Sequence, residues 1–460
     1  MGISIWWIRR DLRLHDNAAL AHALNKSTVV IPLFILDPAL LSTPPANRDH
    51  FLLNALRSLD ADLRKKGSRL IVRNGRPIDV FGKLTDETGA DLISAEADFS
   101  PYAKKRDAEI GELFPLVTLG GPTVYPPQAI VKTDGTPYTI YTPFSRAWKS
   151  LPEPGQPLAA PDCMPPVPES LVTDGIPASK TCDGFPANEM AARERLEQFL
   201  SCAVFQYKDT RNILAQDGTA RISPYFKFGL LSIHEAAHRV FSLISKTENQ
   251  AERGNRVTWL NELIWREFYF SILSHFPDVT RESYRKNLRS ICWSDDQKAL
   301  HAWQEGLTGY PVVDAAMRQL KQSGWMHNRA RMISASFLTK DLLIDWREGE
   351  QWFMQHLIDG DLASNNGGWQ WTAGTGTDAA PYFRIFNPIL QSKKFDPQGE
   401  YIRRWVPELS HVSSDDIHTP RENPDLKLDY PPPIIDHSVG RERALAAYQA
   451  ARLAYEDQSR

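Results

Sequence analysis

Residues 3–8 read ISIWWI and residues 29–36 read VVIPLFIL, and these two short apolar runs decide the fold of the first part of the chain. Similar runs follow at residues 69–73, 91–95 and 116–119. Between them, residues 51–66 repeat leucine at helical spacing. Short strands that alternate with helices predict a parallel, Rossmann-like sheet covered by helices.

The carboxyl ends of these predicted strands are the first place to expect a ligand. Open α/β sheets bind their ligands there, because the loops at that edge leave polar groups and helix ends together. Arg9, Asp37 and Glu96 end or follow three of the predicted strands. We therefore expect a polar site near these residues.

The chain is longer than one hydrophobic core usually sustains, so its 460 residues predict two or more domains. Residues 1–125 carry the alternating pattern and predict an α/β domain. Residues 126–188 are rich in proline, glycine and polar side chains, and predict a long linker over the surface. Residues 189–460 show helical patterns throughout and predict an all-α domain.

Composition restricts the possible functions. With 42% hydrophobic residues, 24% charged residues and a net charge of -3, the chain is an ordinary globular protein. That balance excludes a broadly basic coat for nucleic acid, so any such site must be a local basic patch. The four cysteines form no Cys-x-x-Cys pair, which disfavours a metal site or a disulfide framework. With no signal pattern and no apolar run long enough to cross a membrane, we expect a cytoplasmic protein that binds no metal and no membrane.

Residues 359–371 read DGDLASNNGGWQW and predict a binding site. Asp361, Asn365 and Trp369 are spaced four apart, so on a helix they would share one face. Gly367 and Gly368 would let a ligand come close to the backbone. The polar groups suit a ring edge with hydrogen-bonding nitrogens, and the tryptophans suit stacking or electron donation. An isoalloxazine, the ring of a flavin, meets both conditions.

Several long motifs, in order along the chain, resemble the photolyase and cryptochrome family. They are WWIRRDLRLHDN at 6–17, NELIWREF at 261–268, GYPVVDAAMR at 309–318 with GWMHNR at 324–329, and the run 348–387 with TGTD at 375–378 and FRIFNP at 383–388. The resemblance implies a class I photolyase for cyclobutane pyrimidine dimers. Such an enzyme uses blue light, and its reduced FAD donates an electron to a dimer flipped out of the DNA, which splits into two pyrimidines.

Two other functions stay open at this point. One is a cryptochrome, a signalling flavoprotein without repair activity. The resemblance favours repair at Asn365, because plant cryptochromes have an aspartate at the matching position. The other is a flavin enzyme that does not use light, which would leave the paired lesion-facing helices unexplained. The resemblance also implies a monomer that acts on ultraviolet-damaged DNA, double- or single-stranded.

The resemblance assigns a set of residues to FAD. One part is the segment from Asp217 to Ser223 with Tyr207, whose hydroxyls, amides and arginines suit a pyrophosphate. The plainer alternative for this segment is a turn followed by a helix cap at Ser223, with Pro224 at the first helical position. The implied FAD residues are Tyr207, Thr219, Ala220, Arg221, Ile222, Ser223, Trp259, Arg266, Asn328, Arg331, Asp359, Asp361 and Asn365.

A predicted helix at 261–273 separates an apolar side from one with Glu262, Trp265 and Arg266. A solvated face is the alternative, although a tryptophan between a carboxylate and an arginine suits water poorly. The resemblance implies that Trp265 stacks on the lesion and that Glu262 hydrogen-bonds its base edge. A second helix would repeat the arrangement with Trp325, Asn328, Arg329 and Met332 on one face. Taken alone, Met332 would be core filler.

Arginines are also implied to meet the DNA backbone as bidentate phosphate partners, with surface salt bridging as the alternative. The implied DNA-binding residues are Arg211, Glu262, Trp265, Asn328, Arg329, Met332, Trp371, Arg384 and Gln391. With Glu262 and Asn365, three tryptophans complete the implied catalytic set: Trp293, Trp346 and Trp369 match the relay that carries an electron to the flavin. Because the chain has 13 tryptophans, a structural role is the alternative for each.

The resemblance also implies an antenna chromophore in the first domain. Members of the family that bind a pterin have Asn-Glu at the positions that match Tyr102-Ala103 of this chain, which disfavours methenyltetrahydrofolate. Asp37, Asp98 and Arg106 match the type that binds an 8-hydroxy-5-deazaflavin. Ser100 departs from the acidic residue often found there.

Overall fold

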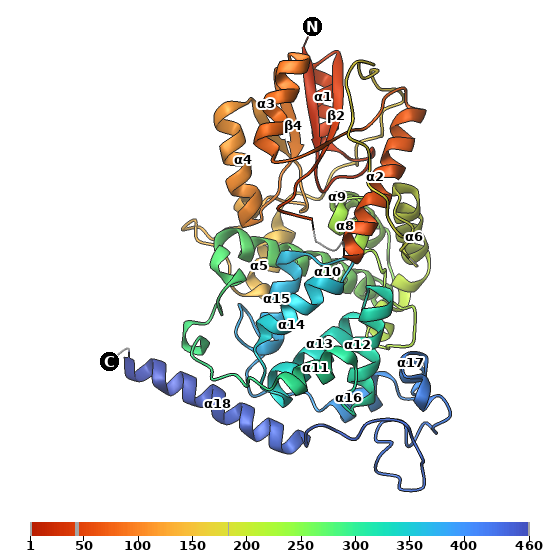
Figure 1. The fold of residues 1–460 in the computed structure, drawn as a ribbon, viewed down its shortest axis with the longest axis vertical. Helices are drawn as coiled ribbons and strands as arrows, with labels where there is room; N and C mark the ends of the chain where they lie inside the picture. Colours follow the sequence, from red (N-terminus) through yellow and green to blue (C-terminus); the bar gives the residue numbers. More distant parts are fainter. Residues whose placement is uncertain (1, 42–45, 183, 459–460) are drawn as a thin grey trace. The chain divides into compact units, whose positions relative to one another are not determined.

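The computed structural model describes residues 2–41, 46–182 and 184–458 (Figure 1). A five-stranded parallel sheet forms its first part, in the order β3-β2-β1-β4-β5. The strands are β1 (Ile3–Ile8), β2 (Val29–Leu36), β3 (Ile71–Asn74), β4 (Leu92–Glu96) and β5 (Leu116–Leu119). The predicted strands agree with these bounds to within two residues, and the predicted fold class is confirmed.

Helices connect the strands because each crossover between parallel strands needs a long connection. They are α1 (Ala18–Lys26), α2 (Asn47–Lys65), α3 (Pro77–Thr88) and α4 (Pro101–Leu113). The strands are buried along most of their length, and Trp7 packs edge-to-face on Phe81 of α3 with 4.9 Å between ring centroids. The sheet is therefore covered by helices, as its apolar strands predict.

The segment that was expected to be a linker, residues 126–188, contains a helix. Besides a 3₁₀ turn, η1 (Pro127–Ala129), it forms α5 (Tyr141–Ser150), which buries Phe144 and Trp148 four residues apart. Proline and glycine elsewhere in the segment obscured this short amphipathic pattern. Helix α5 was not predicted within this segment.

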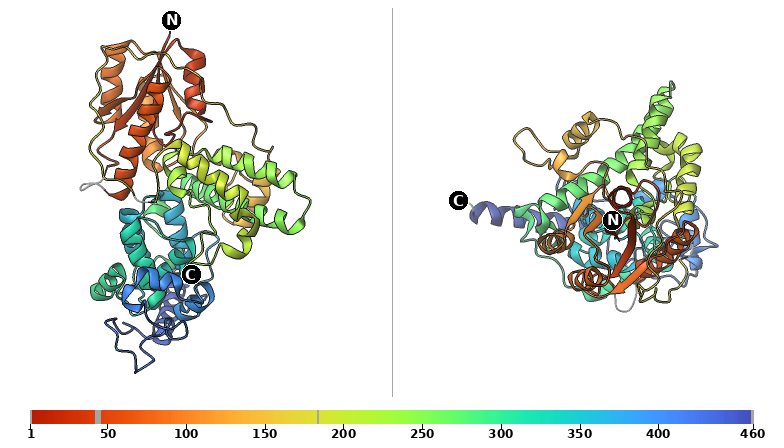
Figure 2. Two further views of the ribbon diagram at one scale, coloured as in Figure 1. Left: turned by 90° about the vertical axis from the view of Figure 1, so that its right-hand side faces the viewer. Right: turned by 90° about the horizontal axis from the view of Figure 1, so that it is seen from above.

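The rest of that segment runs in extended form along the sheet domain (Figure 2). Met164 N donates to Lys66 O, and Asp174 N donates to Val72 O of β3. Val167 joins the apolar core on that side of the sheet. This stretch therefore packs along the sheet, and its role as an inter-domain linker remains a prediction.

The remaining chain is helical, as predicted. Its helices are α6 (Glu189–Ser201), α7 (Tyr207–Thr210), α8 (Ser223–Phe228), α9 (Ile233–Ser245), α10 (Gln250–His275), α11 (Gln297–Glu305), α12 (Pro311–Ser323), α13 (Asn328–Ser336), α14 (Trp346–His356), α15 (Leu362–Ala373), α16 (Pro388–Phe395), α17 (Glu400–Trp405) and α18 (His437–Gln458). Shorter turns are η2 (Ala203–Gln206), η3 (Pro277–Thr280), η4 (Lys286–Leu288), η6 (Pro407–Leu409) and a π-helical turn, η5 (Phe337–Asp341). Helix α12 begins at Pro311 and ends at Gly324, whose φ of 66° suits glycine.

The chain divides into two compact units. The first holds Met1–Lys208 and Thr219–Pro277, and the second holds Asp209–Gly218 and Asp278–Arg460. This division differs from the predicted one, in which 189–460 is a single domain; the division at 125 and 188 remains a prediction. Residues 1, 42–45, 183, 459 and 460 fall inside the predicted spans and lie outside the described residues.

No helix among the described residues is long and apolar enough to cross a membrane. In the same part of the chain, no group of three or more histidine, cysteine, aspartate and glutamate side chains is placed to hold a metal ion.

A buried carboxylate joins two parts of the first unit. Glu267 of α10 is 2% exposed and accepts hydrogen bonds from Val124 N at 2.6 Å and from Trp148 Nε1 of α5 at 2.7 Å. A longer hydrogen bond comes from Tyr125 N. Burial raises the pKa of Glu267 to about 7, although these hydrogen bonds act in the opposite direction.

The raised pKa of Glu267 predicts a pH dependence of stability. Between the unfolded pKa of about 4.3 and the folded pKa, the folded state keeps a proton that the unfolded state has lost. The contribution is fully present below the unfolded pKa and is lost as pH rises through the folded pKa of about 7. We expect the stability of the parent relative to Glu267→Gln to fall as pH rises across this window. Thermal unfolding of both proteins at a series of pH values measures it, and a constant difference would contradict the assignment.

Candidate functional site

Helix α15 carries the motif that first indicated a site. Asp361 is the N-cap residue and accepts a hydrogen bond from Ser364 N at 3.0 Å, so the helix begins just after it. Asn365 lies one turn on, and its Nδ2 donates to the backbone oxygen of Glu350 and to Glu350 Oε1 at 2.9 Å. Within the described part of the chain, no hydrogen bond engages Asn365 Oδ1. Its carbonyl oxygen therefore remains able to accept one.

The neighbouring carboxylate of Glu350 is itself perturbed. Burial raises its pKa, and the hydrogen bond from Asn365 only partly opposes that shift. The NH₂ group of Asn365 is thus committed to Glu350, which orients the amide.

Asp359 and Arg331 form an ion pair in the same unit, with 2.8 Å between Arg331 Nη2 and Asp359 Oδ2. Arg331 also donates from Nε to Met326 O. The other carboxylate oxygen of Asp359, Oδ1, is buried and has no hydrogen-bond partner among the described residues. A buried acceptor without a partner is costly, so this atom suits a donor from a ligand.

The three tryptophans predicted to form an electron relay differ in burial. Trp369 of α15 and Trp346 of α14 are 2% and 1% exposed, and the indole N–H of each has no hydrogen-bond partner in the described structure. Trp293 is half-buried and meets Tyr448 edge-to-face with 6.0 Å between centroids. Gly349 of α14 allows close packing here, because a Cβ at that position would overlap the ring of Trp369. Two members are therefore core residues and the third reaches toward solvent.

Helix α13 begins with two of the predicted contact residues. Asn328 is exposed and its Nδ2 lies 3.9 Å from the sulfur of Met332, which is half-buried. Trp325 was expected on the same helix face as these two residues, but it lies outside the helix. It lies in the turn before α13, because Gly324 ends α12 and His327 caps α13.

Arg329 is held by neighbours other than a carboxylate. Its guanidinium donates to Asn212 Oδ1 at 2.8 Å and lies 4.4 Å from the ring centre of Phe395. Burial and the nearby positive charge of Arg211 lower its pKa. The guanidinium of Arg211 is therefore close enough to disfavour the positive charge of Arg329.

The other predicted DNA contacts of this unit vary in exposure. Arg384 is exposed, whereas Gln391 and Trp371 are half-buried. The side-chain oxygen of Gln391 is buried without a hydrogen-bond partner in the described residues. Lys394 is exposed and lies 5.3 Å from the ring of Phe395.

In the first unit, the loop that precedes α8 is fixed by an arginine. Arg195 of α6 donates to Ala220 O at 2.9 Å and to Thr219 O at 3.2 Å. Arg221 has a positive φ of 51°, which is unusual for a residue other than glycine. Helix α8 begins at Ser223, with Ile222 as its N-cap residue, so the alternative of a cap at Ser223 is wrong. The backbone of this loop is strained at Arg221, and no side chain of the loop forms a capping hydrogen bond with α8.

Aromatic rings surround two other predicted FAD residues. Phe199 lies 5.1 Å from Trp259 and 5.7 Å from Tyr207, and all three are buried. Arg266 donates to Pro122 O and lies 4.5 Å from the ring of Phe270. Trp259 and Arg266 therefore also have structural contacts.

Helix α10 presents Glu262 and Trp265, both half-buried, on its exposed side. Trp265 is stacked face-to-face on Tyr141, with 3.7 Å between centroids and 3° between planes. Phe268 and Tyr269 complete the cluster around it. Sequence reasoning missed Tyr141, because it lies in the segment that was expected to be a linker.

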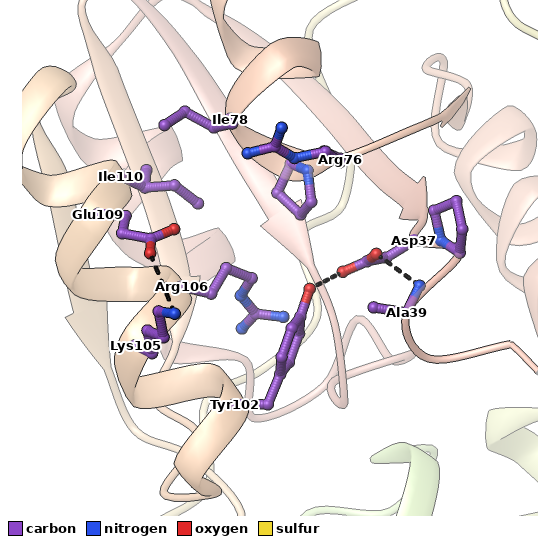
Figure 3. Close-up of a pocket in the computed structure, with 11 residues that line it drawn as sticks. Asp37, Ala39, Arg76, Ile78, Tyr102, Lys105, Arg106, Glu109 and Ile110 are labelled. Atoms are coloured by element: carbon purple, nitrogen blue, oxygen red, sulfur yellow. Dashed lines mark hydrogen bonds and ion pairs between the residues drawn. The ribbon is translucent and has the colours of Figure 1, made fainter.

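The first unit also contains a cavity of about 400 Å³ (Figure 3). It lies beyond β2 and β3 and against α4, with Tyr102, Arg106 and Glu109 on one helix face. The Tyr102 hydroxyl donates to Asp37 Oδ2, and burial with this contact raises the pKa of Tyr102 to about 12. The lining residues are Asp37, Pro38, Ala39, Arg76, Pro77, Ile78, Tyr102, Lys105, Arg106, Glu109 and Ile110.

Asp98, the third predicted antenna residue, does not line this cavity. Burial would raise its pKa, but Arg10 at 3.8 Å and a hydrogen bond from Ser100 N lower it. Ser100 is the N-cap of α4. Asp98 therefore belongs to the support of α4.

The ligand position expected near Arg9 and Glu96 is occupied by the chain's own side chains. Arg9 donates to the backbone oxygen of Glu96 and pairs with Asp107, while Arg13 pairs with the Glu96 carboxylate at 2.5 Å. The cavity lies instead beside the neighbouring strands β2 and β3. Of the three residues at which a ligand was expected, only Asp37 lines it.

Comparisons with known proteins agree with this arrangement. Residues 4–165 match the family model described as DNA photolyase, and residues 259–450 match the one described as FAD binding domain of DNA photolyase. A deoxyribodipyrimidine photo-lyase of Escherichia coli (strain K12) is 41% identical, over 98% of this chain and 99% of the relative. One from Synechococcus is 39% identical, over 98% of this chain and 97% of the relative.

Solved structures agree as well. A class III photolyase from Agrobacterium tumefaciens superposes with a TM-score of 0.90 at 37% identity, covering 98% of each chain. A Synechocystis cryptochrome superposes with a TM-score of 0.86 at 28% identity, covering 97% of this chain and 99% of the other.

The chain belongs to the DNA photolyase family. The predictions of a photolyase enzyme and of an FAD-binding domain are confirmed, and membership supports light-dependent repair of damaged DNA as the general activity.

Proposed function

We propose that this protein splits cyclobutane pyrimidine dimers in DNA by a light-driven electron transfer. The observation that carries the proposal is the half-buried pair on α10, where Trp265 offers a flat ring and Glu262 a carboxylate beside it. A flat ring stacks on any base, and a carboxylate accepts from a base edge. The two relatives named deoxyribodipyrimidine photo-lyase support the same substrate.

The damaged pair would be flipped out of the duplex to reach these groups. Flipping costs less at a lesion, because its stacking and pairing are already impaired. Asn328, Met332 and Trp371 are proposed to contact the extruded pair. Single- and double-stranded DNA would both serve, and we propose a monomer that works in the cytoplasm.

FAD is proposed to be held by the residues that resemble the family's FAD site. The unpaired Oδ1 of Asp359 supports this fit, since it can accept from a ring N–H, and Arg331 fixes the carboxylate. Asp361 and the loop held by Arg195 would supply further contacts, the loop with its backbone and with the side chains of Arg221 and Ser223. When bound and reduced, FAD would supply the electron that splits the dimer and receive it back afterwards. Tyr207, Thr219, Ala220, Ile222, Trp259, Arg266, Asn328 and Asn365 complete the proposed set.

Asn365 favours repair over signalling. Its NH₂ group is used by Glu350, so the group left for a ligand is a carbonyl oxygen that cannot release a proton. An aspartate there could carry either a proton or a charge next to the ring. The amide would therefore accept a hydrogen bond from the reduced ring of a bound flavin without acting as an acid.

The three tryptophans are proposed to restore the reduced flavin from outside. An indole loses an electron readily, and its large ring shortens each step. The half-buried Trp293 would take the outer position, with Trp346 and Trp369 inside.

The cavity of Figure 3 is proposed to hold an antenna of the 8-hydroxy-5-deazaflavin type. Arg76, Lys105 and Arg106 outnumber Asp37 and Glu109 among its lining residues, which suits a ring with an ionisable oxygen. Asp98 would act on this antenna through α4, whose start it supports.

Light dependence tests the main proposal. Purified protein under reducing conditions, mixed with dimer-containing DNA, should restore pyrimidines under blue light and not in the dark. Glu262→Ala should lower repair per bound lesion more than affinity, because a hydrogen bond to the dimer helps most once the dimer carries the extra electron. Lesion binding without any light-dependent repair would instead support a signalling role.

Salt dependence tests the phosphate contacts. Arg211, Arg329, Arg384 and Gln391 are proposed to meet the backbone, so Arg329→Gln should weaken binding to damaged and undamaged DNA alike. The slope of log K against log salt should flatten by about one unit per lost phosphate contact. Arg239→Gln removes a surface arginine paired with Glu197 and serves as the control. Equal slopes for parent and Arg329→Gln would rule out this contact.

Chromophore binding tests the cavity. Titration with 8-hydroxy-5-deazaflavin, followed by fluorescence, should give saturable binding to the parent and weaker binding to Arg106→Gln. Arg64→Gln changes an exposed arginine of α2 outside the cavity and should bind as the parent does. Preferential binding of methenyltetrahydrofolate by the parent would overturn the antenna type.

A further inference from the structure

Trp265 of α10, on which a base is proposed to stack, has a second aromatic ring behind it. Tyr141 and Trp265 are separated by 3.7 Å between centroids with nearly parallel planes, so no base can enter between them. Phe268 meets Trp265 edge-on at 84°, and Tyr269 is tilted against it by 37°. One face of the indole is therefore covered, and a base can stack only on the other face.

Tyr141 is itself held in place from several sides. It begins α5, and its hydroxyl donates to Asn261 O of α10 at 3.0 Å. Phe268 meets its ring edge-on with 6.0 Å between centroids. On the same helix, Lys149 Nζ donates to Asn261 Oδ1 at 2.6 Å. Helix α5 is thus attached to Asn261 of α10 both at its first residue and near its last.

The face-to-face geometry indicates that the surrounding packing imposes the contact. Isolated aromatic pairs prefer an offset or edge-on arrangement to a sandwich. A half-buried indole without a ring behind it could rotate about its side-chain bonds and would lose that freedom on stacking with a base. A ring fixed behind it removes this cost before the DNA arrives.

We propose that Tyr141 is a positioning residue for lesion recognition, which sets the plane of Trp265 so that its free face receives the flipped base. The inference rests on the proposed function, in which Trp265 stacks on the dimer. Tyr141 itself touches no DNA in this scheme. Its ring is what matters, because the stacked ring lies against Trp265, whereas the hydroxyl donates to a backbone carbonyl of helix α10.

Affinity measurements in the dark test this role. Kd values for one single-stranded oligonucleotide, with and without a dimer, are compared for the parent, Tyr141→Ala, Tyr141→Leu, Tyr141→Phe and Thr142→Ala. An aromatic pair of ordinary strength corresponds to about 2-fold to about 13-fold in Kd. We expect Ala and Leu to weaken dimer binding by a factor in this range and to leave undamaged DNA unaffected. The Phe variant should bind as the parent does, and so should Thr142→Ala, which changes an exposed neighbour on the same helix.

The Trp265→Ala background separates positioning from a general structural effect. If Tyr141 acts through Trp265, adding Tyr141→Ala there should change dimer affinity by less than about 2-fold, because coupled residues are not additive. An equal loss in both backgrounds, or an equal loss on damaged and undamaged DNA, would overturn the proposal. If Trp265→Ala loses its preference for dimer-containing over undamaged DNA while Tyr141→Ala binds both as the parent does, this inference alone is wrong. If Trp265→Ala keeps that preference, the proposed function of Trp265 is wrong, and this inference is wrong with it.

Discussion

The carboxylate of Glu267 fixes the chain that follows the sheet onto helix α10. It accepts from two backbone amides, at Val124 and Tyr125, and from the indole of Trp148. A buried carboxyl group is tolerated only where hydrogen bonds replace water, so these three donors are a condition for its burial. Because Trp148 is on α5, the same contact brings α5 against α10. The stack of Tyr141 on Trp265 depends on that placement.

The sheet shows how one pattern can close one site and leave another. Its strand order changes direction between β1 and β4, where open sheets often bind ligands. Here Arg9 and Arg13 fill that position and pair with Asp107 and Glu96. The cavity forms beside β2 and β3, where Tyr102 lies between Arg106 and Asp37 and donates to the Asp37 carboxylate (Figure 3). The guanidiniums of Arg9 and Arg106 also lie over the ring of Trp7, so this ring contacts one arginine of each position.

In the second unit, close helix packing and unpaired polar atoms occur together. Gly349 lets α14 approach the ring of Trp369, and Glu350 next to it takes the amide of Asn365. Nearby in the chain, one carboxylate oxygen of Asp359 has no hydrogen-bond partner within the part of the chain that the structure describes. Packing therefore orients the amide and the ring, while these acceptor atoms have no hydrogen-bond partner among the described residues.

The sequence by itself determined the strands, the helical remainder and the family, because these depend on local periodicity and on long motifs. It also marked Asp361, Asn365 and Trp369 as a group, since spacing on a helix is a local property. It could not locate α5, whose apolar residues lie among prolines, nor show that Ile222 rather than Ser223 precedes α8. Tertiary structure alone decided that Tyr141 covers Trp265 and that arginines close the expected sheet-edge site. It also decided that Asn212 holds Arg329. Each of these contacts joins residues far apart in the sequence, so no local pattern records it.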